Sequence, residues 1–248
     1  MIALVTGASK GIGEASARAL SAAGHRVALV ARDEGALQAV ASSLPGESLV
    51  VAADLLDPGA IEAAFARVEE EWGPVEVLVV NAGASMSAPL VRTTDDDWQR
   101  MLDLNLTAPF RCLRRALPSM TSAGYGRVVV IASVAGKVGS PRIAAYTASK
   151  HGVIGLVRTA AMEVARTGVT VNAVCPGYVD TPMTDESVAA IASGTGRSAD
   201  EARAILENMQ PIGRLVTVDE VAAAVMLCVD NAAVNGQGIN VDGGSVQG

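Results

Sequence analysis

Short runs of apolar residues alternate with amphipathic stretches almost to the end of the chain. Most of these runs are continuously apolar rather than alternating with polar residues, which is typical of strands buried on both faces of a parallel sheet. Seven runs have the length of a strand. We therefore expect strands at residues 2–6, 26–31, 48–53, 75–80, 127–133, 169–175 and 238–241.

The stretches between these runs have the pattern of helices. We expect the longest of them to bend near Pro109. The alternation of strand and helix predicts an α/β fold, with a doubly wound, seven-stranded parallel sheet and helices on both of its faces. Because no linker divides the chain, residues 1–248 are expected to form a single domain. The expected helices span residues 12–23, 33–43, 58–72, 95–120, 146–166 and 217–229.

One long interruption separates the sixth strand from the last helix. Residues 181–215 are polar, contain Gly194 and Gly196 near their middle, and otherwise favour helix. An insert of this length within a compact domain is often a lid over a binding site. We therefore expect a helical lid at this place in the chain.

The composition narrows the classes of function. Half of the 248 residues are hydrophobic but aromatic residues make up only 3%, so the core must be mostly aliphatic. The net charge of −7 argues against nucleic acid, which requires a basic surface, and against attraction to anionic membranes. No apolar run approaches the roughly 18–20 residues of a membrane span, and no signal peptide is recognised. A soluble cytoplasmic protein is expected.

The cysteines and histidines give no metal or disulfide pattern. Cys112, Cys175 and Cys228 are far apart and odd in number, so we expect buried, reduced thiols. His25 and His151 have no partners at metal-ligand spacing. No metal site is expected.

A glycine-rich turn follows the first expected strand. Residues 6–13 read TGASKGIG, which places Gly7, Gly11 and Gly13 between that strand and the first helix. Glycines at such a turn allow a tight bend, close approach of the backbone to a pyrophosphate and close packing of the helix. The helix that follows would direct free N–H groups at the phosphates. The turn therefore indicates a dinucleotide site.

Several further motifs occur in order along the chain. Together with the glycine turn they resemble the short-chain dehydrogenase/reductase family over essentially the whole chain. The resemblance implies a Rossmann fold, NAD(P)-dependent hydride transfer between a carbonyl and an alcohol, and tetramers built through two long central helices. Residues 148–183 are most similar to 3-oxoacyl reductases and polyketide ketoreductases. The motifs are VNAG at 80–83, Asn105, Ser133, YTASK at 146–150 and CPGYVDTPM at 175–183.

One position departs from the family pattern. The family usually has a second asparagine where this chain has Val80, directly before Asn81. That asparagine is mainly a structural group at the end of the fourth strand. Its replacement is expected to change local hydrogen bonding and to leave the chemistry intact.

The YTASK motif supplies a proton donor with a charged neighbour. Tyr146 and Lys150 are four residues apart, so on a helix they share a face. A free tyrosine has a pKa near 10. We expect the Lys150 ammonium, helped by a nicotinamide cation in one redox state, to lower it by favouring phenolate. The resemblance implies that Ser133, at the end of the fifth strand, bonds the substrate oxygen. It also implies that Lys150 binds the nicotinamide ribose and that Asn105 holds a water linking Lys150 to solvent.

The choice between NAD and NADP depends on the end of the second strand. NAD-binding proteins place an acid there, but this chain has Ala31 followed by Arg32. Arg32 and Lys10 can hold a 2′-phosphate, and Asp33 is expected to begin the next helix rather than to neutralise Arg32. NADP(H) is therefore favoured over NAD(H). The full expected cofactor-binding set is Gly7, Ser9, Lys10, Gly11, Ile12, Gly13, Arg32, Asp54, Leu55, Asn81, Ala82, Gly83, Tyr146, Lys150, Pro176, Gly177, Val179 and Thr181.

These expectations favour an NADPH-dependent reductase of a ketone, such as a 3-oxoacyl thioester. An NAD-dependent alcohol or 3-hydroxyacyl-CoA dehydrogenase is the alternative enzyme, and a non-catalytic dinucleotide-binding sensor or scaffold is the alternative of another class. The expected substrate wall is small or apolar, which suits an uncharged ketone. It comprises residues 86–88, 134–138, 143 and 178–179.

Charge bears on how such a substrate is delivered. Acyl carrier proteins are strongly acidic and this chain is also acidic, so free or CoA-bound substrate is favoured. Reductases of this family that act on carrier proteins tend to have arginines beside the cleft. In this chain Arg127 comes only at the start of the fifth strand, and Arg166 ends the helix of the YTASK motif. Arg197 and Arg203 in the expected lid are candidates to bind CoA phosphates.

Overall fold

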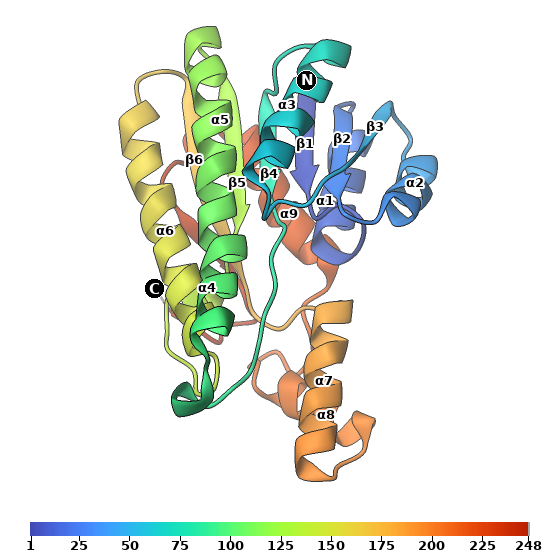
Figure 1. The fold of residues 1–248 in the computed structure, drawn as a ribbon, viewed down its shortest axis with the longest axis vertical. Helices are drawn as coiled ribbons and strands as arrows, with labels where there is room; N and C mark the ends of the chain where they lie inside the picture. Colours follow the sequence, from blue (N-terminus) through green and yellow to red (C-terminus); the bar gives the residue numbers. More distant parts are fainter. Residues whose placement is uncertain (248) are drawn as a thin grey trace.

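The computed structural model describes residues 1–247. In this range seven strands form one parallel sheet in the order β3-β2-β1-β4-β5-β6-β7. Figure 1 shows this sheet between two layers of helices. The expected fold class is confirmed. The strands are β1 (Ile2–Thr6), β2 (Arg26–Ala31), β3 (Ser48–Ala52), β4 (Val77–Val80), β5 (Gly126–Ile131), β6 (Val169–Pro176) and β7 (Gly238–Val241).

The helices divide between the two faces of the sheet. One core cluster packs α3, α5 and α6 against one face, and a second packs α1, α2 and α9 against the other. Because both faces are covered, β4, β5 and β6 are buried along their whole length. The helices are α1 (Gly11–Ala22), α2 (Glu34–Ser43), α3 (Pro58–Trp72), α4 (Asp95–Leu102), α5 (Ala108–Ala123), α6 (Ala144–Val164), α7 (Pro182–Thr195), α8 (Ala199–Asn208) and α9 (Val218–Asp230).

The strand order places a crevice at one edge of the sheet. β1 pairs with β2 on one side and with β4 on the other, so the connections that leave these strands run in opposite directions. In a doubly wound sheet ligands bind beyond the carboxyl ends of the strands at this point. The glycine turn after β1 and the segments after β4 and β5 all lie at this edge.

The long central helical segment is interrupted differently from the expectation. A π-helical turn at Asp103–Thr107 separates α4 from α5, and no separate bend is needed at Pro109. Pro109 lies in the first turn of α5, where its missing N–H is tolerated. Asn105, within the π-helical turn, is 1% exposed and bonds the backbone of Ala84 after β4. The irregular turn therefore coincides with a side chain held by another element.

Two boundaries near the expected catalytic residues also differ. β5 ends at Ile131, so Ser133 lies two residues beyond the strand and caps a short 3₁₀ turn at Val134–Gly136. α6 begins at Ala144 rather than at Tyr146. Tyr146 therefore lies inside the first turn of the helix rather than at its start.

The expected insert is helical. α7 and α8 project beyond the sheet at the foot of Figure 1 and are joined by their own small core of Val188, Ala202, Leu206 and Leu215. A capping box at Ser198 and Glu201 begins α8. None of the helices within residues 1–247 is long and apolar enough to cross a membrane.

Candidate active site

The glycine turn after β1 has the close approaches that its sequence predicted. Gly7 and Gly11 have φ angles of +64° and +60°, a conformation that side chains other than glycine rarely adopt. A Cβ at Gly13 would meet the Gly7 carbonyl oxygen. Asn81, after β4, donates from Nδ2 to the carbonyls of Thr6 and Gly7 at 3.0 Å each. The turn is therefore fixed from both sides with its backbone exposed.

Two helices begin at this turn without side-chain caps. Lys10 and Thr181 occupy the N-cap positions of α1 and α7, and neither side chain accepts a hydrogen bond from its helix. Helix N-termini carry partial positive charge and unpaired N–H groups. The site therefore has two helix ends with donors available for an anionic ligand.

A groove of about 690 Å³ runs along the turn toward the end of β2. Its volume, glycine-rich backbone and helix ends fit a dinucleotide. Twelve residues of the expected cofactor set line it. They are Gly7, Ser9, Lys10, Gly11, Ile12, Arg32, Asp54, Leu55, Asn81, Ala82, Gly83 and Thr181. Arg100 and Leu104 also line the groove and were missed by the sequence reasoning, although their spacing of four residues places them on one helix face.

The acid beside Arg32 is engaged elsewhere. Asp33 is the N-cap of α2, and its Oδ1 accepts from the Ala36 N–H at 3.0 Å. Arg32 is exposed at the groove, and neither it nor Lys10 forms an ion pair within residues 1–247. Two cations are therefore available at this end of the groove.

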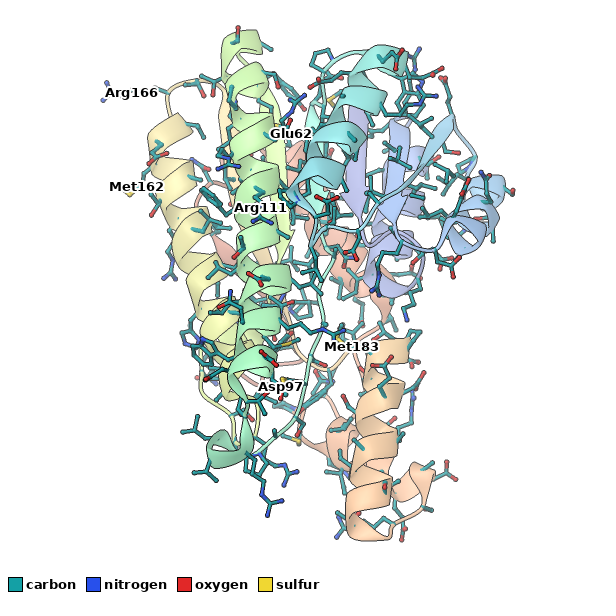
Figure 2. All side chains as sticks on the ribbon, in the orientation of Figure 1. Glu62, Asp97, Arg111, Met162, Arg166 and Met183 are labelled. Atoms are coloured by element: carbon teal, nitrogen blue, oxygen red, sulfur yellow. The ribbon has the colours of Figure 1, made fainter. Side chains whose placement is uncertain are left out.

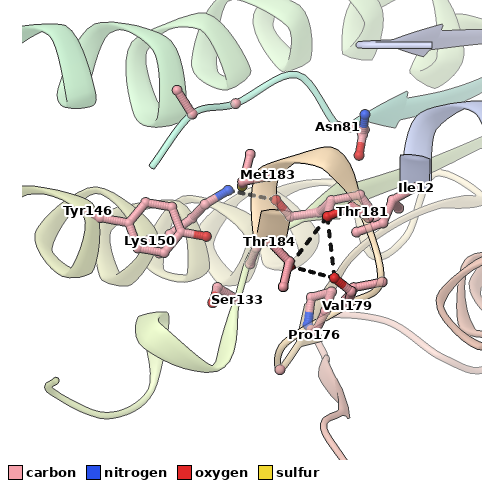
Figure 3. Close-up of a pocket in the computed structure, with 15 residues that line it drawn as sticks. Ile12, Asn81, Ser133, Tyr146, Lys150, Pro176, Val179, Thr181, Met183 and Thr184 are labelled. Carbon is pink, nitrogen blue, oxygen red and sulfur yellow. Dashed lines mark hydrogen bonds between the residues drawn. The ribbon is translucent and has the colours of Figure 1, made fainter. Parts of the chain in front are cut away.

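A smaller pocket of about 100 Å³ continues from the groove. Ser133, Tyr146 and Lys150 lie together on one side of it, as Figure 3 shows. Pro176, Gly177, Val179 and Thr181 line it from the segment after β6. Of the expected cofactor set, Gly13 alone lines neither cavity. It packs inside the turn, against the Gly7 carbonyl and the Asn81 side chain.

Lys150 is buried beside the tyrosine ring. Its Nζ donates to the Ile131 carbonyl at 2.9 Å and lies 5.7 Å from the centroid of the Tyr146 ring. Burial lowers the pKa of Lys150 to about 8. The lysine is 6% exposed and still mostly charged at neutral pH.

The pKa of Tyr146 shifts in the direction opposite to the expectation. Burial raises it above its ordinary value, and the nearby Ser133 hydroxyl only partly opposes this. The spacing of Tyr146 and Lys150 indicated an ammonium that would lower the pKa, but Lys150 is not among the groups that shift it. The loss of hydration at the partly buried phenol sets the direction instead. The phenol therefore keeps its proton at neutral pH.

Asn105 lies behind the pocket rather than in its lining. Its Oδ1 accepts from the Ala84 N–H at 3.0 Å, and its Nδ2 donates to the Ala84 carbonyl at 2.9 Å and to Ser149 Oγ at 3.3 Å. The side chain thus ties the segment after β4 to α6. Its expected role in holding a water beside Lys150 stays a prediction.

The substrate wall differs from the expected one. Of the expected residues only Val179 lines the small pocket. Residues outside the expected wall that also line it include Ala84, Ile131, Ala132, Met183 and Thr184. Residues 134–136 turn away in the 3₁₀ turn, where Ala135 and Gly136 are buried. Met183 ends the CPGYVDTPM motif and Thr184 follows it directly. The motif could therefore have pointed to both residues as part of the pocket.

The arginines considered for substrate delivery lie away from the pocket or are paired. Arg127 is buried and donates to the carbonyls of Gly126, Gly168 and Val229. Arg166 follows α6 at the opposite end from Tyr146, near the top of Figure 2. Neither lies beside the cleft.

Arg203, in the helical insert, forms ion pairs with acidic side chains. It pairs with Asp180 at 2.8 Å, Glu207 at 3.3 Å and Asp185 at 3.5 Å. These three carboxylates neutralise its guanidinium and join α8 to the segment after β6. The expectation that Arg203 meets CoA phosphates is therefore not supported.

The thiols and imidazoles do not form a reactive set. All three cysteines are free and buried, and burial raises the pKa of Cys112 to about 12 and of Cys228 to about 11. Burial also lowers the pKa of His25, and His151 is exposed with Nδ1 at the Thr147 carbonyl. Within residues 1–247 no three His, Cys, Asp or Glu side chains gather as metal ligands.

The family model described as short chain dehydrogenase matches residues 1–192. The chain belongs to the short-chain dehydrogenase family. This short-chain dehydrogenase is 37% identical over 245 residues to the 3-oxoacyl-[acyl-carrier-protein] reductase FabG of Escherichia coli, with 98% of this chain and 96% of FabG covered. It is also 37% identical over 250 residues to the D-beta-hydroxybutyrate dehydrogenase of Rhizobium meliloti, with 98% and 97% covered.

A solved structure has nearly the same fold. A crystal structure of an actinorhodin polyketide ketoreductase variant with NADPH superposes with a TM-score of 0.95 at 41% identity, covering 98% of this chain and 96% of that one. These relatives act on hydroxyl or keto groups. This short-chain dehydrogenase is accordingly an oxidoreductase of such groups, which excludes the non-catalytic alternative.

Proposed function

We propose that this short-chain dehydrogenase reduces ketones with NADPH and that its substrate is a 3-oxoacyl thioester or a similar apolar ketone. The observation that carries the proposal is the pocket in which Ser133, Tyr146 and Lys150 lie together next to the dinucleotide-sized groove. NADPH supplies a hydride to the carbonyl carbon when it is bound. The side chains supply the proton, the orientation and the apolar surroundings.

Ser133, Tyr146 and Lys150 each have a role in this proposal. Tyr146 gives its phenolic proton to the substrate oxygen, and Ser133 donates a hydrogen bond to the same oxygen. Lys150 places a positive charge beside the phenol, which favours phenolate as the proton leaves, and it helps to hold the ribose of the cofactor. Tyr146 carries its proton at neutral pH, as a proton donor must.

The lining of the pocket supports a neutral substrate. Ala84, Ala132, Pro176, Val179 and Met183 present apolar surface around the reacting group. Lys150 is the one ionisable side chain besides Tyr146 among the lining residues that the structure describes. A positively charged group next to the carbonyl would lose its hydration and would meet Lys150 rather than an acid.

The unpaired Arg32 supports NADPH, and its removal tests the preference. Arg32→Ala is expected to weaken NADPH binding by roughly 10- to 100-fold, because a charge-assisted bond to the 2′-phosphate is worth about 1.5–3 kcal/mol. NADH binding should change little. Dissociation constants for both dinucleotides, measured by fluorescence, check this prediction.

A matched control lies on the same strand. Arg26 is exposed at the other end of β2 and pairs with Glu47 at 3.0 Å. Arg26→Ala should leave both affinities unchanged. An NADPH-to-NADH ratio that is the same in wild type and Arg32→Ala would mean that Arg32 does not select the cofactor.

The relative from Rhizobium meliloti favours a second candidate function. Its name is that of a dehydrogenase, so an NAD-dependent oxidation of a 3-hydroxyacyl compound is the alternative direction for the same site. In that direction the same Tyr146 accepts the proton that it donates in reduction. Initial rates in both directions with both dinucleotides separate the two candidates.

We propose delivery of the substrate free or on CoA rather than on an acyl carrier protein. The net charge of −7 supports this because acidic carrier proteins would be repelled. The name of FabG favours the carrier protein instead. We expect kcat/KM for one 3-oxoacyl group to be at least as high on CoA as on a carrier protein at low salt. Faster turnover on the carrier protein that weakens steeply with salt would contradict this prediction.

We also propose a cytoplasmic homotetramer. The exposed face of α6 carries Met162, which is 81% exposed, and Phe110 on α5 is 42% exposed. Large exposed apolar side chains on two adjacent long helices suit an interface between copies. Light scattering of the purified chain tests the assembly.

A further inference from the structure

A buried glutamine connects the helical insert to the segment after β6. Gln210 lies two residues beyond α8 and is 2% exposed. Its Oε1 accepts from the Tyr178 N–H at 3.0 Å, and its Nε2 donates to the Tyr178 carbonyl at 3.0 Å and to the Arg214 carbonyl at 2.7 Å. The carboxamide thus pairs with both backbone polar groups of Tyr178. It thereby makes the two hydrogen bonds that a neighbouring strand would make in a sheet.

Residues 176–181, which we call the strap, form one wall of the small pocket. Figure 3 shows Pro176, Val179 and Thr181 on the side of the pocket that faces Tyr146 and Lys150. The strap begins at the end of β6 and leads into α7. Any displacement of its backbone therefore changes the space in which substrate and cofactor meet.

Other contacts of the strap come from the last part of the chain. The Gly177 N–H donates to the Val241 carbonyl at 3.0 Å, and the Asp180 N–H donates to the Val216 carbonyl at 2.8 Å. The Val216 N–H donates to the Tyr178 carbonyl at 2.9 Å. The Tyr178 N–H has no backbone acceptor among these contacts, and Gln210 Oε1 accepts its hydrogen bond. A partly buried N–H that loses its acceptor is costly, so this contact constrains the strap.

Gly177 and Gln210 fit each other. A Cβ at Gly177 would meet Gln210 Oε1 and would lie 3.1 Å from Asp242 Cα. The missing side chain at Gly177 therefore provides the room that the carboxamide occupies. This fit gives a second, independent way to disturb the same contact.

We propose that Gln210 is a positioning residue that fixes the strap as a wall of the ketone pocket and joins the α7–α8 insert to that wall. The identity of the pocket rests on the proposed function. Ser133 follows β5, and Tyr146 and Lys150 lie on α6, so these side chains keep their own contacts when the strap is loosened. Loss of Gln210 should therefore weaken binding more than it slows the chemical step.

The first test replaces the carboxamide with an apolar side chain of similar length. In Gln210→Met we expect the Kd of NADPH and the KM of the ketone each to rise about 10-fold, while kcat stays within about 3-fold of wild type. Amide exchange at Tyr178 should become faster. Gln237→Met is the control, because Gln237 is exposed and its Nε2 bonds the Asn235 carbonyl. It should leave all of these values unchanged.

The second test is a double-mutant cycle between Gly177 and Gln210. Gly177→Ala alone should raise the Kd of NADPH about 10-fold, chiefly by displacing the carboxamide. It should have a smaller effect in a Gln210→Ala background, where only the close approach to Asp242 remains. Additive effects in the double variant would overturn the proposal. So would a Gln210→Met protein that unfolds at lower temperature but keeps wild-type Kd, KM and exchange at Tyr178.

The readouts separate this inference from the proposed function. NADPH affinity and amide exchange need no turnover, so they judge Gln210 even when the wild type reduces no ketone and the proposed function fails. When Gln210→Met does not fold, Gly177→Ala decides, since it leaves the glutamine in place. Wild-type NADPH affinity in that variant would then refute the role of the Gly177–Gln210 contact.

Discussion

Replacing Tyr146 with phenylalanine is expected to lower the kcat of ketone reduction by about 10³-fold, since general-acid catalysis contributes roughly 10²–10⁴-fold. The variant keeps the ring that packs in the first turn of α6 and loses only the O–H that carries the proton. NADPH affinity should stay within about 3-fold of wild type. The loss of NADPH absorbance with a panel of ketones measures turnover, and fluorescence measures binding.

Tyr125→Phe is the matched control for this prediction. Tyr125 lies before β5, at the edge of the sheet opposite the pocket, and its hydroxyl contacts Met1 Sδ at 2.9 Å. Its loss should leave turnover unchanged. Near wild-type turnover in Tyr146→Phe would show that the proton comes from elsewhere and would remove the basis of the proposed mechanism.

The strands could be predicted from the sequence because burial on both faces leaves a simple signal. β1, β2 and β7 have the predicted boundaries, since each apolar run ends at a turn-forming or polar residue. The glycine turn could also be predicted from the sequence. Its three glycines are required by backbone conformation and by close contact with the Gly7 carbonyl, which are local demands that the spacing itself expresses.

Features that depend on contacts between distant elements could not be predicted in this way. The π-helical turn at residues 103–107 accompanies the bonds between Asn105 and Ala84, and no local pattern announces it. Arg203 is paired with carboxylates because folding brings Asp180 and Asp185 to it. Two of the three hydrogen bonds of Gln210 likewise go to Tyr178, 32 positions away.

The direction of the tyrosine pKa shift shows a different limit. The spacing of Tyr146 and Lys150 correctly indicated that the two side chains are neighbours, and Nζ lies 5.7 Å from the ring centroid. The balance between charge and burial was not readable, because burial depends on β6, the strap and α7. Burial is the largest influence on both side chains, and it raises the pKa of Tyr146 and lowers that of Lys150.

The second large effect is expected at Lys150. Lys150→Met should lower turnover by about 10²-fold or more, because the charge that stabilises phenolate is lost. It should also weaken NADPH binding, since the same ammonium is proposed to hold the ribose. Binding and turnover measured on the same variant distinguish these losses from the Tyr146→Phe result, in which binding is kept.

The same variant should change how stability depends on pH. Burial lowers the pKa of Lys150 from its ordinary 10.5 to about 8 in the folded protein. Below about pH 8 both the folded and unfolded chains carry the proton, and the folded state bears the full cost of the buried charge. Between about pH 8 and 10.5 the unfolded chain binds more protons, so the stability of wild type rises with pH.

Methionine at position 150 removes this titration, so the variant should lack the rise. The difference in unfolding free energy between Lys150→Met and wild type should therefore move in favour of wild type by up to about 3 kcal/mol from about pH 7 to about pH 10.5. The lost bond from Nζ to the Ile131 carbonyl shifts the difference by a similar amount at every pH and does not hide the slope. Urea unfolding of both proteins without added dinucleotide, at intervals across this range, measures it. A difference that is constant with pH would mean that the lysine is hydrated, and the buried charge beside Tyr146 would have to be abandoned.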